Sequence, residues 1–60
     1  MLQCVIKQNN YTSMDRVYLE LWLISRGVEY KLGRFGDWLC WLTPEQIGIL
    51  QDEGWPVRVL

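Results

Sequence analysis

The stretch from Val28 to Gln46, VEYKLGRFGDWLCWLTPEQ, predicts a hairpin followed by the start of a helix. Apolar residues alternate with charged ones over residues 28–32, which is the two-residue period of a half-buried strand. Residues 33–36 have glycine at both ends and predict a turn, after which residues 37–42 resume as a strongly apolar strand. Thr43, the proline after it and a glutamine three positions on have the form of a helix N-terminus.

The residues before this stretch predict a strand and a longer helix. Residues 2–7 alternate weakly between apolar and polar side chains, and Asn9-Asn10 then interrupts the pattern. Thr12 and Asp15 have the form of a capping box, and Gly27 provides the helix end. At about 3.6 residues per turn, one apolar stripe runs between these ends, and we expect it to pack on the sheet: Met14, Val17, Tyr18, Leu21 and Ile24.

The residues after the stretch predict a second short helix and a last strand. The helix that begins at Thr43 would bury Ile47 and Leu50 and end at Gly54. In residues 55–60, Pro56 removes one ladder hydrogen bond, which favours the edge of a sheet. Residues 1–60 are therefore predicted to form one α+β domain with the ferredoxin-like order βαββαβ. In that arrangement a four-stranded antiparallel sheet has central first and third strands and carries two helices on one face.

The composition argues against several classes of function. The 60 residues have a formal net charge of −1, so no strong field draws in nucleic acid, and no long acidic run imitates it. Two cysteines without any histidine leave at most two soft ligands where structural zinc needs four, so we predict no metal and no cofactor. Since no histidine can serve as the base for a Ser, Cys or Thr nucleophile, we expect no enzymatic activity.

The cysteines and the apolar stretches indicate where the protein is found. Cys4 and Cys40 could lie side by side on the two central strands, where small thiols are commonly core residues. Residues 1–10 are a mixed, strand-like segment rather than a secretion signal. Residues 17–24, the most apolar stretch, contain Glu20 and are far shorter than the roughly 20 residues of a membrane span. We therefore expect a cytoplasmic protein without membrane contact and with both thiols reduced.

The phase of the strands predicts an uncovered sheet face with apolar residues at its centre. One alternating set would face the helices: Leu2, Cys4, Ile6, Val28, Tyr30, Leu32, Trp38, Cys40, Leu42, Trp55, Val57 and Val59. The opposite face then carries Val5, Leu39 and Trp41, surrounded by Lys7, Glu29, Lys31 and Arg58. An aromatic anchor inside a polar rim is typical of protein interfaces. Two alternatives stay open: the third strand could have the reverse phase, or residues 9–12 could cover Trp41.

A second candidate surface lies on the first helix. Leu19 and Leu23 are one turn apart and lie away from the apolar stripe, close to Arg16 and Arg26. We expect this pair to be exposed and open to a partner, although single surface leucines are ordinary in proteins.

Residues 34–41, RFGDWLCW, resemble the aromatic third-strand motif of RNA-recognition domains, whose bases stack on aromatic side chains of an open sheet. Four residues match that motif by type: Arg34, Trp38, Leu39 and Trp41. Residues 35–37 depart from its glycine and aromatic positions, so we assign no membership. The resemblance implies a site in which Trp41 or Trp38 stacks on a base and nearby cations clamp it, namely Lys7, Lys31 and Arg58.

The favoured interpretation is a non-enzymatic protein-interaction module, such as the small adaptors or inhibitors that phages and mobile elements encode. It would act as a homodimer or higher oligomer, or docked on a larger protein. Its expected binding residues are Val5, Lys7, Leu19, Leu23, Lys31, Leu39, Trp41 and Arg58. The alternative is binding of a nucleotide, single-stranded RNA or another small ligand on the open sheet face, with an affinity that falls as salt rises.

Overall fold

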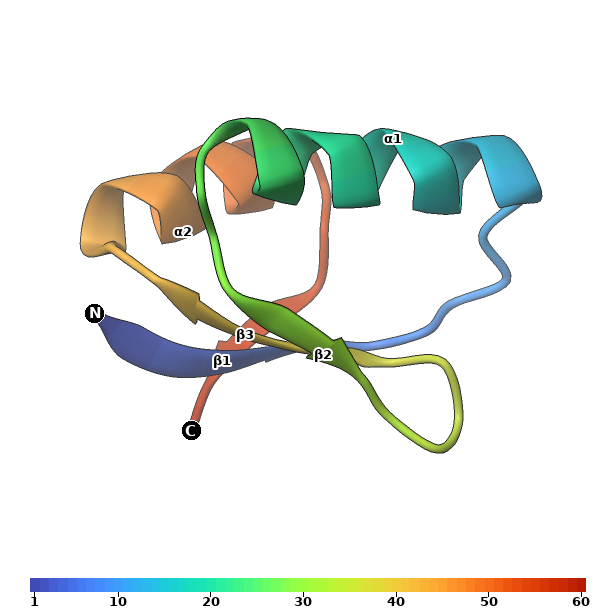
Figure 1. Cartoon of the computed structure of the whole chain (residues 1–60), viewed down its shortest axis with the longest axis horizontal. Coiled ribbons are helices and arrows are strands. Elements are labelled where there is room, and N and C mark those ends of the chain that lie inside the picture. Colours follow the sequence, from blue (N-terminus) through green and yellow to red (C-terminus); the bar gives the residue numbers. More distant parts are fainter.

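The six predicted elements form in the predicted order in the computed structural model, which describes all 60 residues. They are β1 (Leu2–Ile6), α1 (Ser13–Ser25), β2 (Tyr30–Leu32), β3 (Trp38–Leu42), α2 (Pro44–Asp52) and β4 (Val57–Val59). The strands form one antiparallel sheet in the order β2-β3-β1-β4, and both helices cover the same face of it (Figure 1). The predicted α+β class and βαββαβ arrangement are confirmed, with β1 and β3 at the centre.

The strand register settles which side chains face the helices. Cys4 of β1 lies opposite Cys40 of β3, and Ile6 lies opposite Trp38. All four side chains are fully buried, as is Leu42. Because successive strand residues point to opposite faces, Leu39 and Trp41 must lie on the uncovered face. The predicted phase of the third strand is therefore confirmed.

The ends of the edge strands are less covered than the predicted phase suggested. Leu32 and Val59 have the expected parity, yet both side chains are exposed. The observed strands β2 and β4 are also shorter than the predicted segments 28–32 and 55–60. The two helices therefore cover the middle of the sheet better than its outer strands.

Both helices begin with the capping box that the sequence predicts. The Thr12 hydroxyl oxygen accepts a hydrogen bond from the Asp15 backbone N–H at 3.1 Å, and the Asp15 carboxylate accepts one from the Thr12 N–H at 3.1 Å. Thr43 and Gln46 repeat the pattern at the start of α2, at 3.1 and 3.0 Å. The chain leaves α2 through Gly54, whose φ of +93° favours glycine.

The orientation of α1 differs from the prediction. Leu19 and Leu23, which we expected at the surface, are fully buried, and Trp22 is buried beside them. The apolar stripe that we expected to pack on the sheet faces solvent instead: Met14, Val17, Tyr18, Leu21 and Ile24. The assignment of Leu19 and Leu23 to a partner surface is therefore wrong.

The reason for this reversal is that α1 has two apolar stripes, and the charges lie beside the buried one. The Arg16 guanidinium lies 4.1 Å from the centre of the Trp38 ring, and that of Arg26 lies 4.1 Å from the centre of the Trp22 ring. Such stacking lets a charged side chain cover apolar surface while its head group stays wet. The positions of Arg16 and Arg26 beside Leu19 and Leu23 therefore indicate the edge of the core and not a solvent-facing side of the helix.

Candidate functional site

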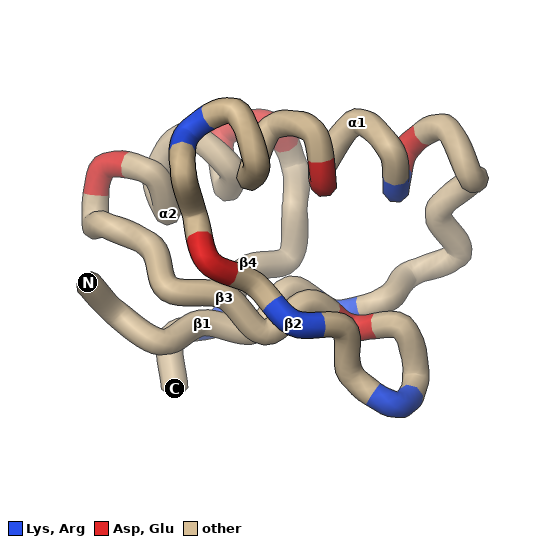
Figure 2. The backbone as a smooth tube through the Cα atoms, in the orientation of Figure 1, with Lys and Arg blue, Asp and Glu red and all other residues tan.

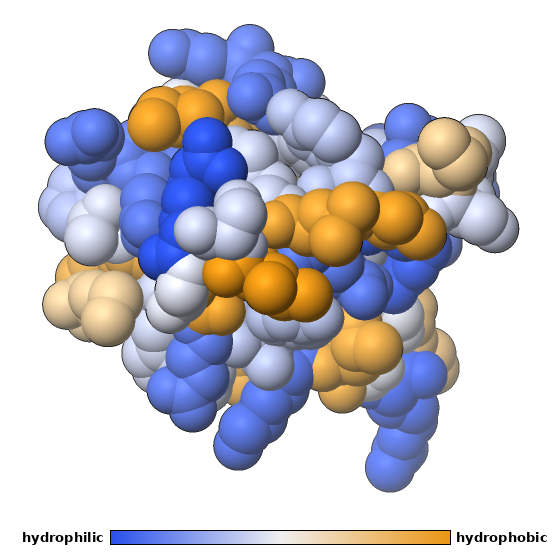
Figure 3. All heavy atoms as spheres, turned by 45° about the horizontal axis from the view of Figure 1, so that its top comes forward, coloured by the Kyte–Doolittle hydropathy of each residue, from blue (hydrophilic) through white to orange (hydrophobic).

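Helix α1 presents an apolar face to solvent, which we call the α1 stripe. It consists of Met14, Val17, Tyr18, Leu21 and Ile24, whose side chains are 51 to 78% exposed. Hydrophobic side chains gather in a band across the middle of the helical side of the molecule (Figure 3). Four of these residues, at positions 14, 17, 21 and 24, follow the three-four-three spacing of a helix–helix seam.

The charged residues of α1 are held away from this stripe. Glu20 accepts a hydrogen bond from the Trp38 indole N–H at 3.1 Å, toward the sheet. Arg16 lies on Trp38 and hydrogen-bonds Gln8, and Arg26 lies on Trp22. Asp15 is engaged in the helix cap. The stripe therefore contains no charged residue, whereas a solvent-facing helix surface is ordinarily its most charged side.

The open sheet face has the composition that the sequence predicts. Val5, Leu39 and Trp41 are partly buried there, and Lys7, Lys31 and Arg58 are exposed. Lys31 lies opposite Leu39, Leu39 opposite Val5, and Val5 opposite Arg58, so one row across all four strands has a cation at each end. The structure thus brings six of the eight predicted binding residues to one side of the sheet, with Lys7 just beyond β1.

The segment 9–12 does not lie over Trp41. Its Tyr11 ring instead packs on the helical side of the sheet, with its centroid 4.7 Å from that of Trp55 and 6.2 Å from that of buried Trp38. Trp41 lies opposite Gln3 of β1, and its side chain is only partly buried. Most acidic positions lie on the helical layer, and most basic positions lie on the sheet layer and the loop between β2 and β3 (Figure 2).

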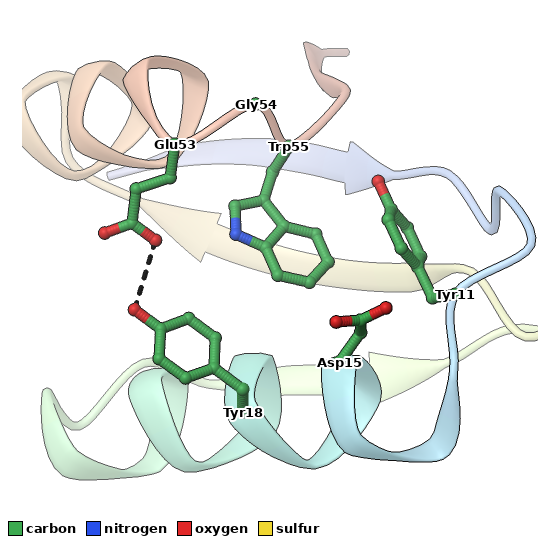
Figure 4. Close-up of a pocket in the computed structure, with 6 residues that line it drawn as sticks. All are labelled: Tyr11, Asp15, Tyr18, Glu53, Gly54 and Trp55. Atoms are coloured by element: carbon green, nitrogen blue, oxygen red, sulfur yellow. Dashed lines mark hydrogen bonds between the residues drawn. The ribbon is translucent and has the colours of Figure 1, made fainter.

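A shallow pocket of about 470 Å³ lies where the start of α1 meets the end of α2, and we call it the α1–α2 pocket. Its lining combines three aromatic residues with two carboxylates and a glycine: Tyr11, Tyr18, Trp55, Asp15, Glu53 and Gly54. In Figure 4, Trp55 lies between the two tyrosines, and the Asp15 carboxylate points into the same space from α1. The Tyr18 hydroxyl donates a hydrogen bond to Glu53 Oε1 at 3.2 Å.

The two carboxylates make this pocket electrostatically negative. The charge of Glu53, together with its hydrogen bond, raises the pKa of Tyr18 above its usual range. Burial raises the pKa of Tyr11, and the charge of Asp15 adds to that effect. Both tyrosines thus remain neutral donors at ordinary pH, and no lysine or arginine lines the pocket.

The two thiols are inert core groups in this geometry. Cys4 and Cys40 are free and buried side by side across β1 and β3. Burial raises the pKa of Cys40 to about 11, with a further contribution from Cys4, and burial also raises the pKa of Cys4. Since the thiolate is the reactive form, neither thiol is activated for nucleophilic chemistry. No three potential metal ligands come together, and neither helix is long and apolar enough to cross a membrane.

Sequence reasoning missed the α1 stripe and the α1–α2 pocket as surfaces. The stripe residues were recognised as a set and placed on the wrong side of the helix. A useful signal was Trp22, the largest side chain of α1, which joins Leu19 and Leu23 in a second apolar stripe. The pocket is formed by residues 11–18 together with residues 53–55, and no local sequence pattern predicts that these distant segments come together.

The domain is thus a small two-layer α+β fold with an uncharged helix face, a mixed sheet face and one aromatic pocket. Comparison with models of protein families, with curated proteins and with solved structures found no match.

Proposed function

We propose that the protein is a non-enzymatic protein-interaction module that uses the α1 stripe to pair with a second copy of itself. The observation that carries this proposal is the absence of charge on a helix face that is more than half exposed. The domain would act in the cytoplasm with reduced thiols, as a small adaptor or inhibitor of the kind that phages and mobile elements encode.

The size of the apolar surface supports a specific but weak association. The exposed parts of the five side chains amount to on the order of 500 Å², near the upper end of the roughly 300 to 600 Å² found for the largest patch on a typical monomer. Two such faces would bury on the order of 1,000 Å², which is about the lower limit for a specific interface. We therefore expect a concentration-dependent dimer rather than an obligate one.

Self-pairing fits the pattern of the stripe because a twofold interface must be complementary to itself. In an antiparallel pair of α1 helices, Met14 would meet Ile24 of the second copy, and Val17 would meet Leu21. Each pair combines a side chain from the N-terminal half of the stripe in one copy with a side chain from the C-terminal half in the other copy. Glu20, which flanks the seam, is already hydrogen-bonded to Trp38, so its charge is turned toward the sheet.

The test is the solution mass measured by light scattering and by sedimentation over a range of concentrations, with reductant present. Leu21→Lys puts a charge into the centre of the seam, and we expect that variant to be monomeric at every concentration. Leu32→Lys is the matched control, because Leu32 is equally exposed, at 57% against 60% for Leu21, and lies away from α1. The control should dimerise like the original chain.

Two results would contradict the proposal. One is a monomer at all concentrations up to about 1 mM, since that bounds the association free energy at roughly −4 kcal/mol or weaker. The other is a dimer that Leu21→Lys leaves intact.

A second candidate function is binding of a nucleotide or single-stranded RNA on the open sheet face. The observation that favours it is the cross-strand row with Lys31 and Arg58 at its ends and Trp41 in the neighbouring row. A labelled oligonucleotide should then bind with a salt-dependent affinity, and Trp41→Ala should weaken it by roughly 5- to 150-fold, since stacking contributes about 1 to 3 kcal/mol per base. Undetectable binding at low salt would exclude this candidate.

A further inference from the structure

We propose that the α1–α2 pocket binds an alkylammonium cation, with the methylated nitrogen held against Tyr11, Tyr18 and Trp55 and near the carboxylates of Asp15 and Glu53. The pocket does not need helix pairing in order to form, and its ligand class follows from its lining. Tyr18 is the one residue that the pocket and the α1 stripe share.

The aromatic side chains supply the contact surface that such a cation requires. A ring face attracts a cation placed within about 6 Å of its centroid, and groups of aromatic rings are the common means of holding quaternary ammonium groups. Tyr11 and Trp55 already pack together, with centroids 4.7 Å apart and planes tilted by 48°, so they form one continuous wall. Tyr18 lies on the other side of the same space (Figure 4).

The carboxylates supply charge without closing the pocket. Asp15 uses one oxygen for the Thr12 backbone N–H, and Glu53 uses one for the Tyr18 hydroxyl. The second oxygen of each carboxylate makes no hydrogen bond within the protein, so both carboxylates keep an unpaired oxygen at the pocket lining. Both anchors also fix the positions of the carboxylates before any ligand arrives, which reduces the ordering cost of binding.

The geometry disfavours other kinds of ligand. An anion would meet two carboxylates and no basic group. A metal ion would find too few oxygen ligands, and the aromatic walls could not coordinate it. A neutral apolar ligand would gain the ring contacts alone. The volume of about 470 Å³ lies within the usual range of ligand pockets, roughly 300 to 1,000 Å³.

The test is a titration with choline, followed by the indole and amide N–H signals in two-dimensional NMR spectra at constant ionic strength. The control ligand is the uncharged analogue in which carbon replaces the choline nitrogen. We expect choline to shift the Trp55 indole signal at millimolar concentrations. The uncharged analogue should bind at least about fivefold more weakly, because it lacks the charge that the rings and carboxylates attract.

Variants separate the pocket from its surroundings. Glu53→Gln keeps the shape and removes one charge, and we expect it to weaken choline binding by roughly fivefold. Asp52→Asn makes the same change in charge at the neighbouring residue, which does not line the pocket, and should leave the affinity within about twofold. Tyr18→Leu removes one exposed ring and should weaken binding by a factor comparable to that for Glu53→Gln.

A peptide containing trimethyllysine distinguishes the two sources of such a cation. If the natural ligand is a free small molecule, choline and the peptide should bind about equally. If it is a side chain of another protein, the peptide should bind more tightly and shift further signals outside the pocket. Leu21→Lys should abolish helix pairing, and choline should still shift the Trp55 signal of that variant, so failure of one proposal can be told from failure of the other.

The inference is overturned if choline and its uncharged analogue bind equally, or if neither shifts the Trp55 signal. It is also overturned if Glu53→Gln and Asp52→Asn have the same effect.

Discussion

Trp38 contacts several separate parts of the molecule. It is fully buried, its indole N–H binds Glu20 of α1, and Arg16 of the same helix lies on its ring. Its centroid also lies 6.2 Å from those of Tyr11 and Trp55, which belong to the segments before α1 and before β4. One residue of β3 therefore holds both neighbouring segments in the positions that shape the α1–α2 pocket.

Replacing Trp38 by phenylalanine should lower the free energy of unfolding by about 1 to 3 kcal/mol, because the change leaves a cavity and removes the hydrogen bond to Glu20. Trp41→Phe is the matched control, since Trp41 is only partly buried on the open sheet face. It should cost less than about 1 kcal/mol. Urea unfolding followed by circular dichroism measures both values. Equal losses in the two variants would refute the central role of Trp38.

The thiol of Cys40 predicts a pH dependence of stability. Its pKa rises from 9.0 in the unfolded chain to about 11 in the fold, so the folded protein favours the neutral thiol. This contribution is fully present below pH 9 and is lost as the pH rises toward 11, because the unfolded chain releases its proton first. We expect the urea concentration at the midpoint of unfolding to decrease as the pH is raised from 9 to 11.

The control for that pH dependence is Cys40→Ala, which removes the titrating group from the same site. Its urea midpoint should fall less steeply over the alkaline range than that of the original chain. Identical alkaline slopes in the two proteins would show that other groups cause the whole effect.

At the scale of the element, α1 combines a buried stripe and an exposed stripe of similar apolar character. Leu23 and Leu21 are two residues apart, yet the first is fully buried and the second is 60% exposed. The ordinary arrangement of an apolar face and a charged face is thus replaced by two apolar faces with charges between them.

This arrangement predicts unequal costs for two similar substitutions. Leu23→Ala should lower the free energy of unfolding by about 2 to 5 kcal/mol, because it opens a cavity in the core. Leu21→Ala should change it by no more than about 0.5 kcal/mol in dilute solution, where α1 is unpaired. Thermal or urea unfolding at low protein concentration provides the comparison. A larger loss for Leu21→Ala would mean that the helix is turned the other way.

The sequence predicted the elements well because their signals are local. The capping residues Thr12 and Thr43, the turn at residues 33–36 and the alternation in β3 each act within a few positions. The open sheet face followed from that alternation. The rotation of α1 could not be obtained in the same way, because two stripes fit one helical period and only packing against the rest of the core, Trp38 included, decides between them.

At the scale of the whole molecule, a chain of 60 residues buries a small core and has little stability in reserve. Domains of this size bury only about 60% of the surface that the unfolded chain exposes. Any association that binds the folded form alone therefore adds a noticeable share to the total stability.

We accordingly expect the midpoint of thermal unfolding to rise with protein concentration. Mass action links folding to pairing, so a tenfold increase in concentration above the dimer dissociation constant should raise the midpoint by a few degrees. Leu21→Lys should show a midpoint that does not depend on concentration, while Leu32→Lys should behave like the original chain. Scanning calorimetry over a series of concentrations gives the result. If the midpoint of Leu21→Lys also rises with protein concentration, the dimer contact lies outside the α1 stripe.

The short outer strands have a consequence for aggregation. A chain that is half hydrophobic and ends its sheet on open edges is at risk of adding strands from other molecules and growing into fibres. Here each edge strand, β2 and β4, offers only three residues, with Lys31 in the middle of one and Arg58 in the middle of the other. Pro56, just before β4, withholds a further backbone donor. The edges of the sheet thus disfavour the addition of strands from other molecules, while the side chains of the α1 stripe and the open sheet face stay exposed to solvent or partly so.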